Sequence, residues 1–248
     1  MKYRFWIKSL LFFIALSLLT AVLGMLFCSS LFTRDKLPPS ATTNSAPTRY
    51  KTVIIDAGHG GEDGGASSAA GLIEKEVNLE ITKLLAEMLR AEGVNVIMTR
   101  EDDRLLYDRN TNYKGRKKKL DLAARLAIAD STPDAIFVSI HMNSFTDPQY
   151  RGLQVWYSQN HPDSAILAEL IRKENKEKLQ PDNNRQTKAA NSSINLLHNA
   201  SRPAVLVECG FLSNVDEAAL FETSEYRQKV ALILFCSITE FLNNTSNT

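Results

Sequence analysis

The 248-residue sequence is poor in the residues that build disulfide frameworks and thiolate metal sites. It has three cysteines, Cys28, Cys209 and Cys236, and none lies at the short spacing of a cysteine zinc site. Cys209 lies within an apolar, strand-like run, so we interpret it as a small buried hydrophobic residue without chemistry of its own. Only four histidines are present, which narrows any search for histidine ligands.

The chain also lacks a strong excess of charge of either sign, since its formal net charge is +1. No acidic residue precedes Asp35, and four of the 29 basic residues lie up to that point, at Lys2, Arg4, Lys8 and Arg34. From Asp35 onward the chain has 25 basic and 28 acidic residues, so this part carries no positive excess and a nucleic-acid partner is not indicated. With 44% hydrophobic residues, the chain can bury one substantial core rather than two large ones.

An apolar run without charged side chains covers residues 9–33. It meets the length of about 20 residues that a bilayer-spanning helix needs, and the basic residues before it predict a cytoplasmic N-terminus. The run is longer than the ~7–15 apolar residues of a signal peptide, and no Ala-x-Ala site follows it. We therefore predict an uncleaved membrane anchor in residues 1–34, with a cleaved signal peptide as the alternative, and an extended linker in residues 35–50.

Apolar runs and helical periodicities alternate along residues 51–248. This alternation predicts a single three-layer α/β domain, in which helices flank both faces of a mostly parallel sheet. The strands are expected at 53–55, 94–99, 135–141, 153–157 and 204–208, and the helices at 77–92, 120–128, 164–179, from 214 onward and at 226–242. A polar loop is expected at 180–191. The carboxyl ends of parallel strands are where binding groups gather.

A glycine-rich loop follows the first expected strand and carries His59 with acidic neighbours. It does not match a dinucleotide-binding loop, because Asp63 stands where the third glycine belongs, and the Gly-Lys-Ser/Thr of a phosphate loop is absent. The loop is therefore expected to bind a metal or a substrate, with a positive φ at one or more of Gly58, Gly60 and Gly61.

Two histidines and a glutamate lie at expected strand ends: His59, His141 and Glu208. Neutral imidazoles and carboxylates are the ligands of hydrolytic zinc sites, in which one coordination position stays open for water. Such a site needs a further carboxylate, which we expect near the start of the first helix. Glu74 is well placed there, and Glu76 is the alternative.

Four motifs occur in order along the chain: Asp56-Ala-Gly-His-Gly-Gly, Gly71-Leu-Ile-Glu-Lys, Ser139-Ile-His-Met-Asn and Val207-Glu-Cys-Gly-Phe-Leu-Ser-Asn. Together they resemble the zinc-dependent N-acetylmuramoyl-L-alanine amidases of bacterial cell-wall metabolism, over residues 52–242. The resemblance implies that His59, Glu74 and His141 are the zinc ligands and that Glu208 is the catalytic carboxylate. It also implies cleavage of the amide between N-acetylmuramic acid and the L-alanine of the peptidoglycan stem peptide. One departure is His198, which stands where the family commonly has an arginine; we expect it in a loop, and His161 is expected to be structural.

A single N-terminal hydrophobic segment without wall-binding repeats resembles the amidases of spore cortex, including the germination-specific type. The expected location is the outer side of the cytoplasmic membrane, or the exterior if the segment is cleaved, with peptidoglycan as substrate and a protein activator as an open question. Vegetative wall turnover, daughter-cell separation and a non-catalytic, membrane-tethered wall-binding module are alternatives. A zinc peptidase is disfavoured because the His-Glu-x-x-His motif is missing.

Overall fold

The computed structural model describes residues 49–108, 110 and 114–245. The expected anchor and all but the last two residues of the expected linker lie outside the described residues. Among the helices of the described part, none has the length and apolar character required to cross a membrane. Tyr50, at the end of the expected linker, is buried, and its ring stacks on Phe241 with 5.7 Å between the ring centroids.

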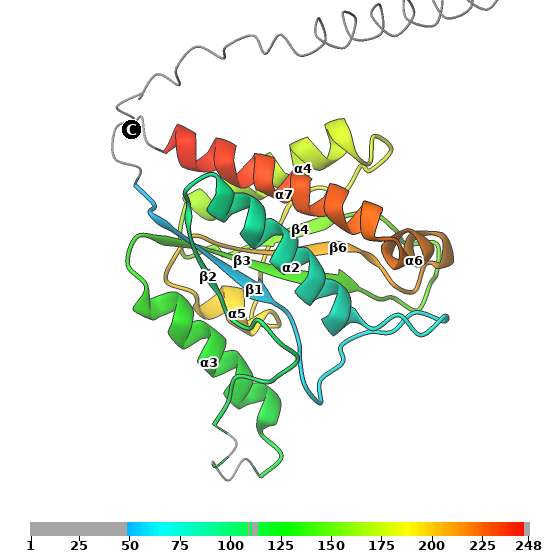
Figure 1. The fold of residues 1–248 in the computed structure, drawn as a ribbon, viewed down its shortest axis with the longest axis horizontal. Helices are drawn as coiled ribbons and strands as arrows, with labels where there is room; N and C mark the ends of the chain where they lie inside the picture. Colours follow the sequence, from blue (N-terminus) through cyan, green and yellow to red (C-terminus); the bar gives the residue numbers. More distant parts are fainter. Residues whose placement is uncertain (1–48, 109, 111–113, 246–248) are drawn as a thin grey trace, which may run out of the picture. The chain divides into compact units, whose positions relative to one another are not determined.

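Strands and helices alternate as the sequence predicts (Figure 1). The strands are β1 (Thr52–Ala57), β2 (Asn95–Met98), β3 (Ala135–Asn143), β4 (Gln154–Tyr157), β5 (Lys188–Ala189) and β6 (Ala204–Phe211). The helices are α2 (Glu74–Ala91), α3 (Lys117–Ser131), α4 (Asp163–Lys178), α5 (Asn195–Asn199), α6 (Val215–Glu222) and α7 (Ser224–Asn244).

All six strands form one sheet in the order β2-β1-β3-β6-β4-β5. The first four strands in this order are parallel, whereas β4 pairs with β6 in the antiparallel direction and β5 pairs with β4 in parallel. The carboxyl ends of the central strands β1, β3 and β6 therefore lie side by side at the same end of the sheet, where the antiparallel strand β4 begins. This is where a parallel sheet gathers its functional side chains.

Helices cover both faces of the sheet, as expected for a three-layer domain (Figure 1). On one face, α2, α4 and α7 pack over alternate residues of the central strands, including Val53, Val138 and Val207. On the other face, α3 and α5 cover a smaller core that contains Ile54, Phe137 and Leu206. The apolar side chains of β1, β3 and β6 face both layers, which is typical of parallel strands buried on both sides.

The structure differs from the sequence-based expectation in three places. Residues 180–191 were expected to form only a loop, but they contain the edge strand β5, which is too short to give a periodic pattern. The short helix α5 was not expected, and His198 lies in it rather than in a loop. Strand β6 continues past Glu208 to Phe211, so Glu208 lies inside the strand near its carboxyl end.

Candidate active site

The loop after β1 carries His59 at the carboxyl end of the strand. The backbone of His59 has a conformation that few residues other than glycine adopt. His59 has a φ of 62°, and Gly60 and Gly61 have φ values of 137° and 56°, which confirms the expected positive φ for two of the three glycines. Gly58 is required for a different reason. A Cβ atom at this position would lie 2.3 Å from Cε1 of His141, closer than real contacts allow.

Three side chains from separate elements converge beside this loop. His59, Glu74 and His141 each offer one ligand atom, and these atoms lie within 4.8 Å of one another. Oε1 of Glu74 is 3.2 Å from Nε2 of His59 and 3.0 Å from Nδ1 of His141. The three side chains are only 15%, 4% and 19% exposed, respectively. Glu76, the alternative to Glu74, is exposed and lies outside this cluster.

The main chain fixes the Glu74 carboxylate in place. Oε2 accepts a hydrogen bond of 2.7 Å from the backbone amide of Ala66, and Oε1 accepts one of 3.0 Å from that of Met142. Glu74 is also the first residue of α2, where the helix dipole stabilises a negative charge. Burial raises the pKa of Glu74, but hydrogen bonds and charge interactions with His141 and His59 outweigh burial, so that its pKa lies well below its usual range.

The imidazole of His59 has a second acidic neighbour. Its Nδ1 lies 3.0 Å from Oδ2 of Asp63, on the side of the ring away from Glu74, which is an ion-pair contact without the geometry of a hydrogen bond. Burial lowers the pKa of His59, but the two carboxylates outweigh this effect and raise it overall. A carboxylate beside one ring nitrogen orients the imidazole and increases its basicity, which is the usual arrangement around a metal-binding histidine.

Strand register places Glu208 next to this cluster. His141 of β3 is paired with Glu208 of β6, which is paired in turn with Gln154 of β4, so the three residues form one row across the sheet. Oε2 of Glu208 is shielded from solvent and has no hydrogen-bond partner among the described residues. The pKa of Glu208 is raised to about 7 overall, because burial and the charge of Glu74 raise it by more than His141 and His59 lower it.

Two buried arginines bind the main chain of the loop that carries His59, which we call the histidine loop. Arg125 of α3 donates hydrogen bonds of 2.8 and 2.7 Å to the carbonyl oxygens of Ala57 and His59. Arg100, which follows β2, donates bonds of 2.8 and 3.0 Å to the carbonyl oxygens of Ala57 and Gly58. Both arginines are almost fully buried, since Arg100 is 1% and Arg125 is 2% exposed.

The sequence-based reasoning did not single out these arginines. Arg125 belongs to a helix recognised only by its apolar spacing, and it is neutralised by Asp56 and Asp121. Arg100 directly precedes a stretch, 101–119, whose many charges indicate a solvated surface. The only available signal is that Arg125 and Asp121 are four residues apart on one helix, a spacing that is common on exposed surfaces too.

The other histidines and Cys209 take no part in the cluster. His161 accepts a hydrogen bond of 3.2 Å at Nδ1 from the backbone amide of Asp163, which agrees with the expected structural role. His198 is exposed on α5 and lies outside the cluster. Cys209 is fully buried in the larger core, and burial raises the pKa of its thiol. It is a core residue, as expected.

The chain matches known proteins over the whole region that carries this site. The family model described as N-acetylmuramoyl-L-alanine amidase matches residues 53–240, which is well over half of the chain. The chain belongs to this family. As an enzyme of this family it is an N-acetylmuramoyl-L-alanine amidase, which acts on peptidoglycan.

Relatives of this amidase include a curated enzyme and two solved structures. The germination-specific N-acetylmuramoyl-L-alanine amidase of Bacillus subtilis is 34% identical over 197 residues, which are 79% of this chain and 82% of the relative. The CwlD amidase of Clostridioides difficile, solved in complex with the GerS lipoprotein, is 39% identical with a TM-score of 0.73, and the match covers 77% of this chain and 98% of that one. The amidase AmiC2 of Nostoc punctiforme is 31% identical with a TM-score of 0.67, covering 78% and 97%.

Proposed function

We propose that this amidase depends on zinc and hydrolyses the amide between N-acetylmuramic acid and the L-alanine of the stem peptide. The observation that carries the proposal is the meeting of His59, Glu74 and His141 beside the shielded carboxylate of Glu208. Each of these residues comes from a different element of the fold, and their side chains gather at the carboxyl edge of the sheet.

The residues present fit a zinc ion. Two imidazoles and one carboxylate are a ligand set of catalytic zinc sites, which keep a further position open. His59, Glu74 and His141 would hold the metal, and Asp63 would orient His59 through the ring nitrogen that faces away from Glu74. A zinc ion bound there would supply a Lewis acid for the poorly electrophilic carbonyl of an amide.

Glu208 has the properties of the proton-transfer group. Its carboxylate takes the proton of the attacking water and returns it to the nitrogen of the leaving L-alanine. Burial raises the pKa of Glu208 above its usual value, and a raised pKa makes a carboxylate a better acceptor of a proton. The unpartnered Oε2 of Glu208 is free to accept the proton without first breaking a hydrogen bond in the protein.

Arg100 and Arg125 keep the histidine loop in position. Between them they bind the carbonyl oxygens of three successive residues, Ala57 at the end of β1 and Gly58 and His59 in the loop. The donors of a guanidinium group lie in one rigid plane, so each arginine fixes two carbonyl groups at once. This support limits the movement of a loop whose φ of 62° at His59 is unfavourable by itself.

The biological setting that we propose is the spore cortex, on the outer side of the cytoplasmic membrane. The germination-specific relative supports this setting, and the uncharged run of residues 9–33 supports export and anchoring. The structural relative in complex with a lipoprotein supports a protein partner for this amidase as well. Deletion of the gene should change the muropeptides of the cortex; a change confined to the vegetative wall would assign the enzyme to vegetative turnover.

The experiment that tests the mechanism compares two glutamate variants of the full-length protein. Glu208→Gln keeps the shape of the side chain but cannot accept a proton, so it should retain zinc and cleave at least about 100-fold more slowly. Glu74→Gln should lose zinc and activity together. Metal analysis and release of stem peptide from purified peptidoglycan are measured on the same samples. If Glu208→Gln loses zinc while Glu74→Gln keeps it, the two roles are exchanged; full activity of Glu208→Gln would refute the mechanism.

A further inference from the structure

A hollow of about 260 Å³ lies beside the row of residues that contains Glu208. Its floor includes Gln154, the strand partner of Glu208, and Trp156, two residues further along the same face of β4. The backbones of neighbouring strands are about 4.8 Å apart, so Gln154 connects this hollow to Glu208 across one strand spacing. The two parts of a substrate that flank the scissile bond extend away from the active site, and this hollow is one place where such a part can bind.

The hollow carries positive charge and aromatic surface. Arg185 and Lys188 are its charged lining residues, and none of the lining residues is acidic. The other lining residues are four aromatic ones and two polar ones: Phe145, Tyr150, Trp156, Phe211, Asn143 and Gln154. Phe145 and Tyr150 are 55% and 41% exposed, which is high for large aromatic side chains. The chemistry of this surface fits an anionic ligand with a partly apolar body.

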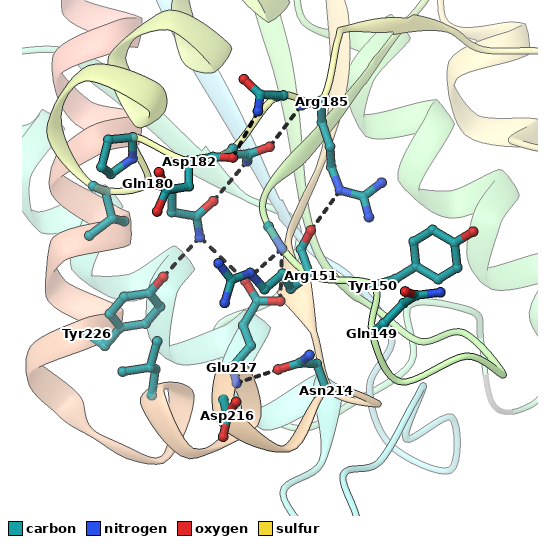
Figure 2. A pocket seen from close by; sticks show the side chains of 16 residues that line it. Gln149, Tyr150, Arg151, Gln180, Asp182, Arg185, Asn214, Asp216, Glu217 and Tyr226 are labelled. Atoms are coloured by element: carbon teal, nitrogen blue, oxygen red, sulfur yellow. Dashed lines mark hydrogen bonds between the residues drawn. The ribbon is translucent and has the colours of Figure 1, made fainter.

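The side chain of Arg185 is held in a fixed position at the end of the hollow. Its Nε donates a hydrogen bond of 2.8 Å to the carbonyl oxygen of Arg151, and its guanidinium lies 4.6 Å from the ring centroid of Phe211 and 5.7 Å from that of Tyr150. Figure 2 draws a second, larger pocket that shares Tyr150 and Arg185 with this hollow, and it shows the guanidinium of Arg185 between the main chain of Arg151 and the ring of Tyr150. Among the described residues, no hydrogen-bond acceptor occupies its two terminal nitrogens.

The loop that carries Arg185 is itself anchored. The amide of Arg185 donates to Oδ1 of Asn183 at 3.0 Å, and Nδ2 of Asn183 donates to the carbonyl oxygen of Leu153 at 2.9 Å. The second cation, Lys188, belongs to β5, where its ammonium group lies 5.2 Å from the ring centroid of Trp156. Both cations are therefore positioned before a ligand arrives, which reduces the entropy lost on binding.

We propose that this hollow is the subsite for the stem peptide and that Arg185, assisted by Lys188, binds the α-carboxylate of the second stem residue. This inference rests on the proposed function. The second residue of the stem is a D-glutamate joined through its γ-carboxyl group, so it carries the first free carboxylate after the bond that is cleaved. The glycan strand carries no comparable negative charge, because the lactyl carboxyl group is part of the scissile amide.

The distances agree with this placement. Phe211, over which Arg185 lies, is three residues beyond Glu208 on β6, but an irregularity sets these three residues against two of β3, so the separation along the strands is about 7 Å. An extended peptide covers roughly 3.3–3.6 Å per residue, so the second residue of the stem lies about 7 Å from the scissile bond. The planar, forked guanidinium is suited to bind a carboxylate with two hydrogen bonds.

The test uses two defined glycan-linked tripeptides that differ in one group. One has the free α-carboxylate on its second residue, and in the other this carboxylate is amidated. We expect the zinc-loaded wild-type protein to have a lower KM for the acid form. Arg185→Gln should raise KM for the acid form about tenfold or more, since hydrogen bonds to charged groups are strong, with kcat changed little. Its KM for the amidated form should stay near the wild-type value, and Arg185→Lys should fall between the two.

Lys173→Gln is the matched control, because it removes the same charge from an exposed position on α4, on the opposite face of the sheet. It should leave both KM values unchanged. Zinc content and thermal unfolding are measured for every variant. If Arg185→Gln raises KM equally for both substrates, or if the wild type does not distinguish them, carboxylate recognition is refuted. If the wild type cleaves neither substrate, the proposed function fails and the subsite falls with it.

Discussion

Gly58 lies so close to the ring of His141 that no side chain fits between them, and Gly58→Ala tests this directly. The added Cβ would lie 2.3 Å from Cε1 and 2.4 Å from Nε2 of the imidazole ring. An ordinary contact begins at 3.4 Å, so the ring must retreat by about 1.1 Å. Gly58 does not have a positive φ, so the backbone itself tolerates alanine and the perturbation is purely steric.

The surrounding structure determines how this clash is relieved. His141 belongs to β3, whose backbone is fixed between β1 and β6, so the ring has to rotate away or the histidine loop has to move. Either movement separates the ligand atoms that now lie within 4.8 Å of one another. Disturbing the support of a metal ligand typically costs about 10–100-fold in metal affinity. A displacement of about 1 Å can cost about 100-fold in rate.

We therefore expect Gly58→Ala to bind zinc about 10–100-fold more weakly and to lose about 100-fold in kcat/KM when zinc is saturating. Zinc affinity is measured by competition with a chromophoric chelator, and activity by release of stem peptide. Gly64→Ala is the control in the same loop, because its Cβ would meet only Cγ2 of Ile73 at 3.4 Å. Wild-type zinc affinity and activity in Gly58→Ala, or an equal loss in Gly64→Ala, would refute the reasoning.

Three further predictions concern the support of the site and the N-terminal segment. Arg125→Lys cannot bind the carbonyl groups of Ala57 and His59 together, so we expect it to lower the free energy of unfolding by about 1–3 kcal/mol in thermal or urea unfolding; unchanged stability would contradict this role. Burial raises the pKa of Asp56, but Arg125 and two hydroxyl groups outweigh it, so its pKa lies below the usual value. The stability from Asp56 is therefore present above its unfolded pKa of about 3.9 and is lost as the pH falls through its lower folded value. Urea midpoints between about pH 2 and 6 should fall less steeply in Asp56→Asn than in the wild type, and equal slopes would argue against it. If residues 9–33 are an uncleaved anchor, the full-length protein should stay in the membrane fraction after washing with high salt and keep its own N-terminus; a soluble form that begins after residue 30 would indicate a signal peptide.

The fold was predictable because its local patterns are strong. The run around Val53 and the run before His141 are apolar enough to indicate buried strands, and the helix after Glu74 shows clear periodicity up to Gly93. Strand β5 and helix α5 were missed because they have two and five residues, which is too few for a period to be recognised. The antiparallel direction of β4 was also not predictable, since it depends on pairing with β6 across the sheet.

By itself, the sequence determined the candidates for the proposed chemistry. His59, Glu74, His141 and Glu208 stand in motifs whose residue types and order already predict a hydrolytic metal site of the amidase family. These features are local, because a glycine loop, a strand end and a helix start are each encoded by a few neighbouring residues.

Only the tertiary structure decided how these residues are held and what lies beside them. It placed Glu74 rather than Glu76 in the cluster, because the start of α2 buries the first side chain and exposes the other. It buried the side chains of Arg100 and Arg125, although nothing near them in the sequence distinguishes them from surface arginines. The register of the sheet placed Gln154 beside Glu208, and Gln154 lines the same hollow as Arg185. Burial and register arise from contacts between residues far apart in the chain, and no local pattern of residues records them.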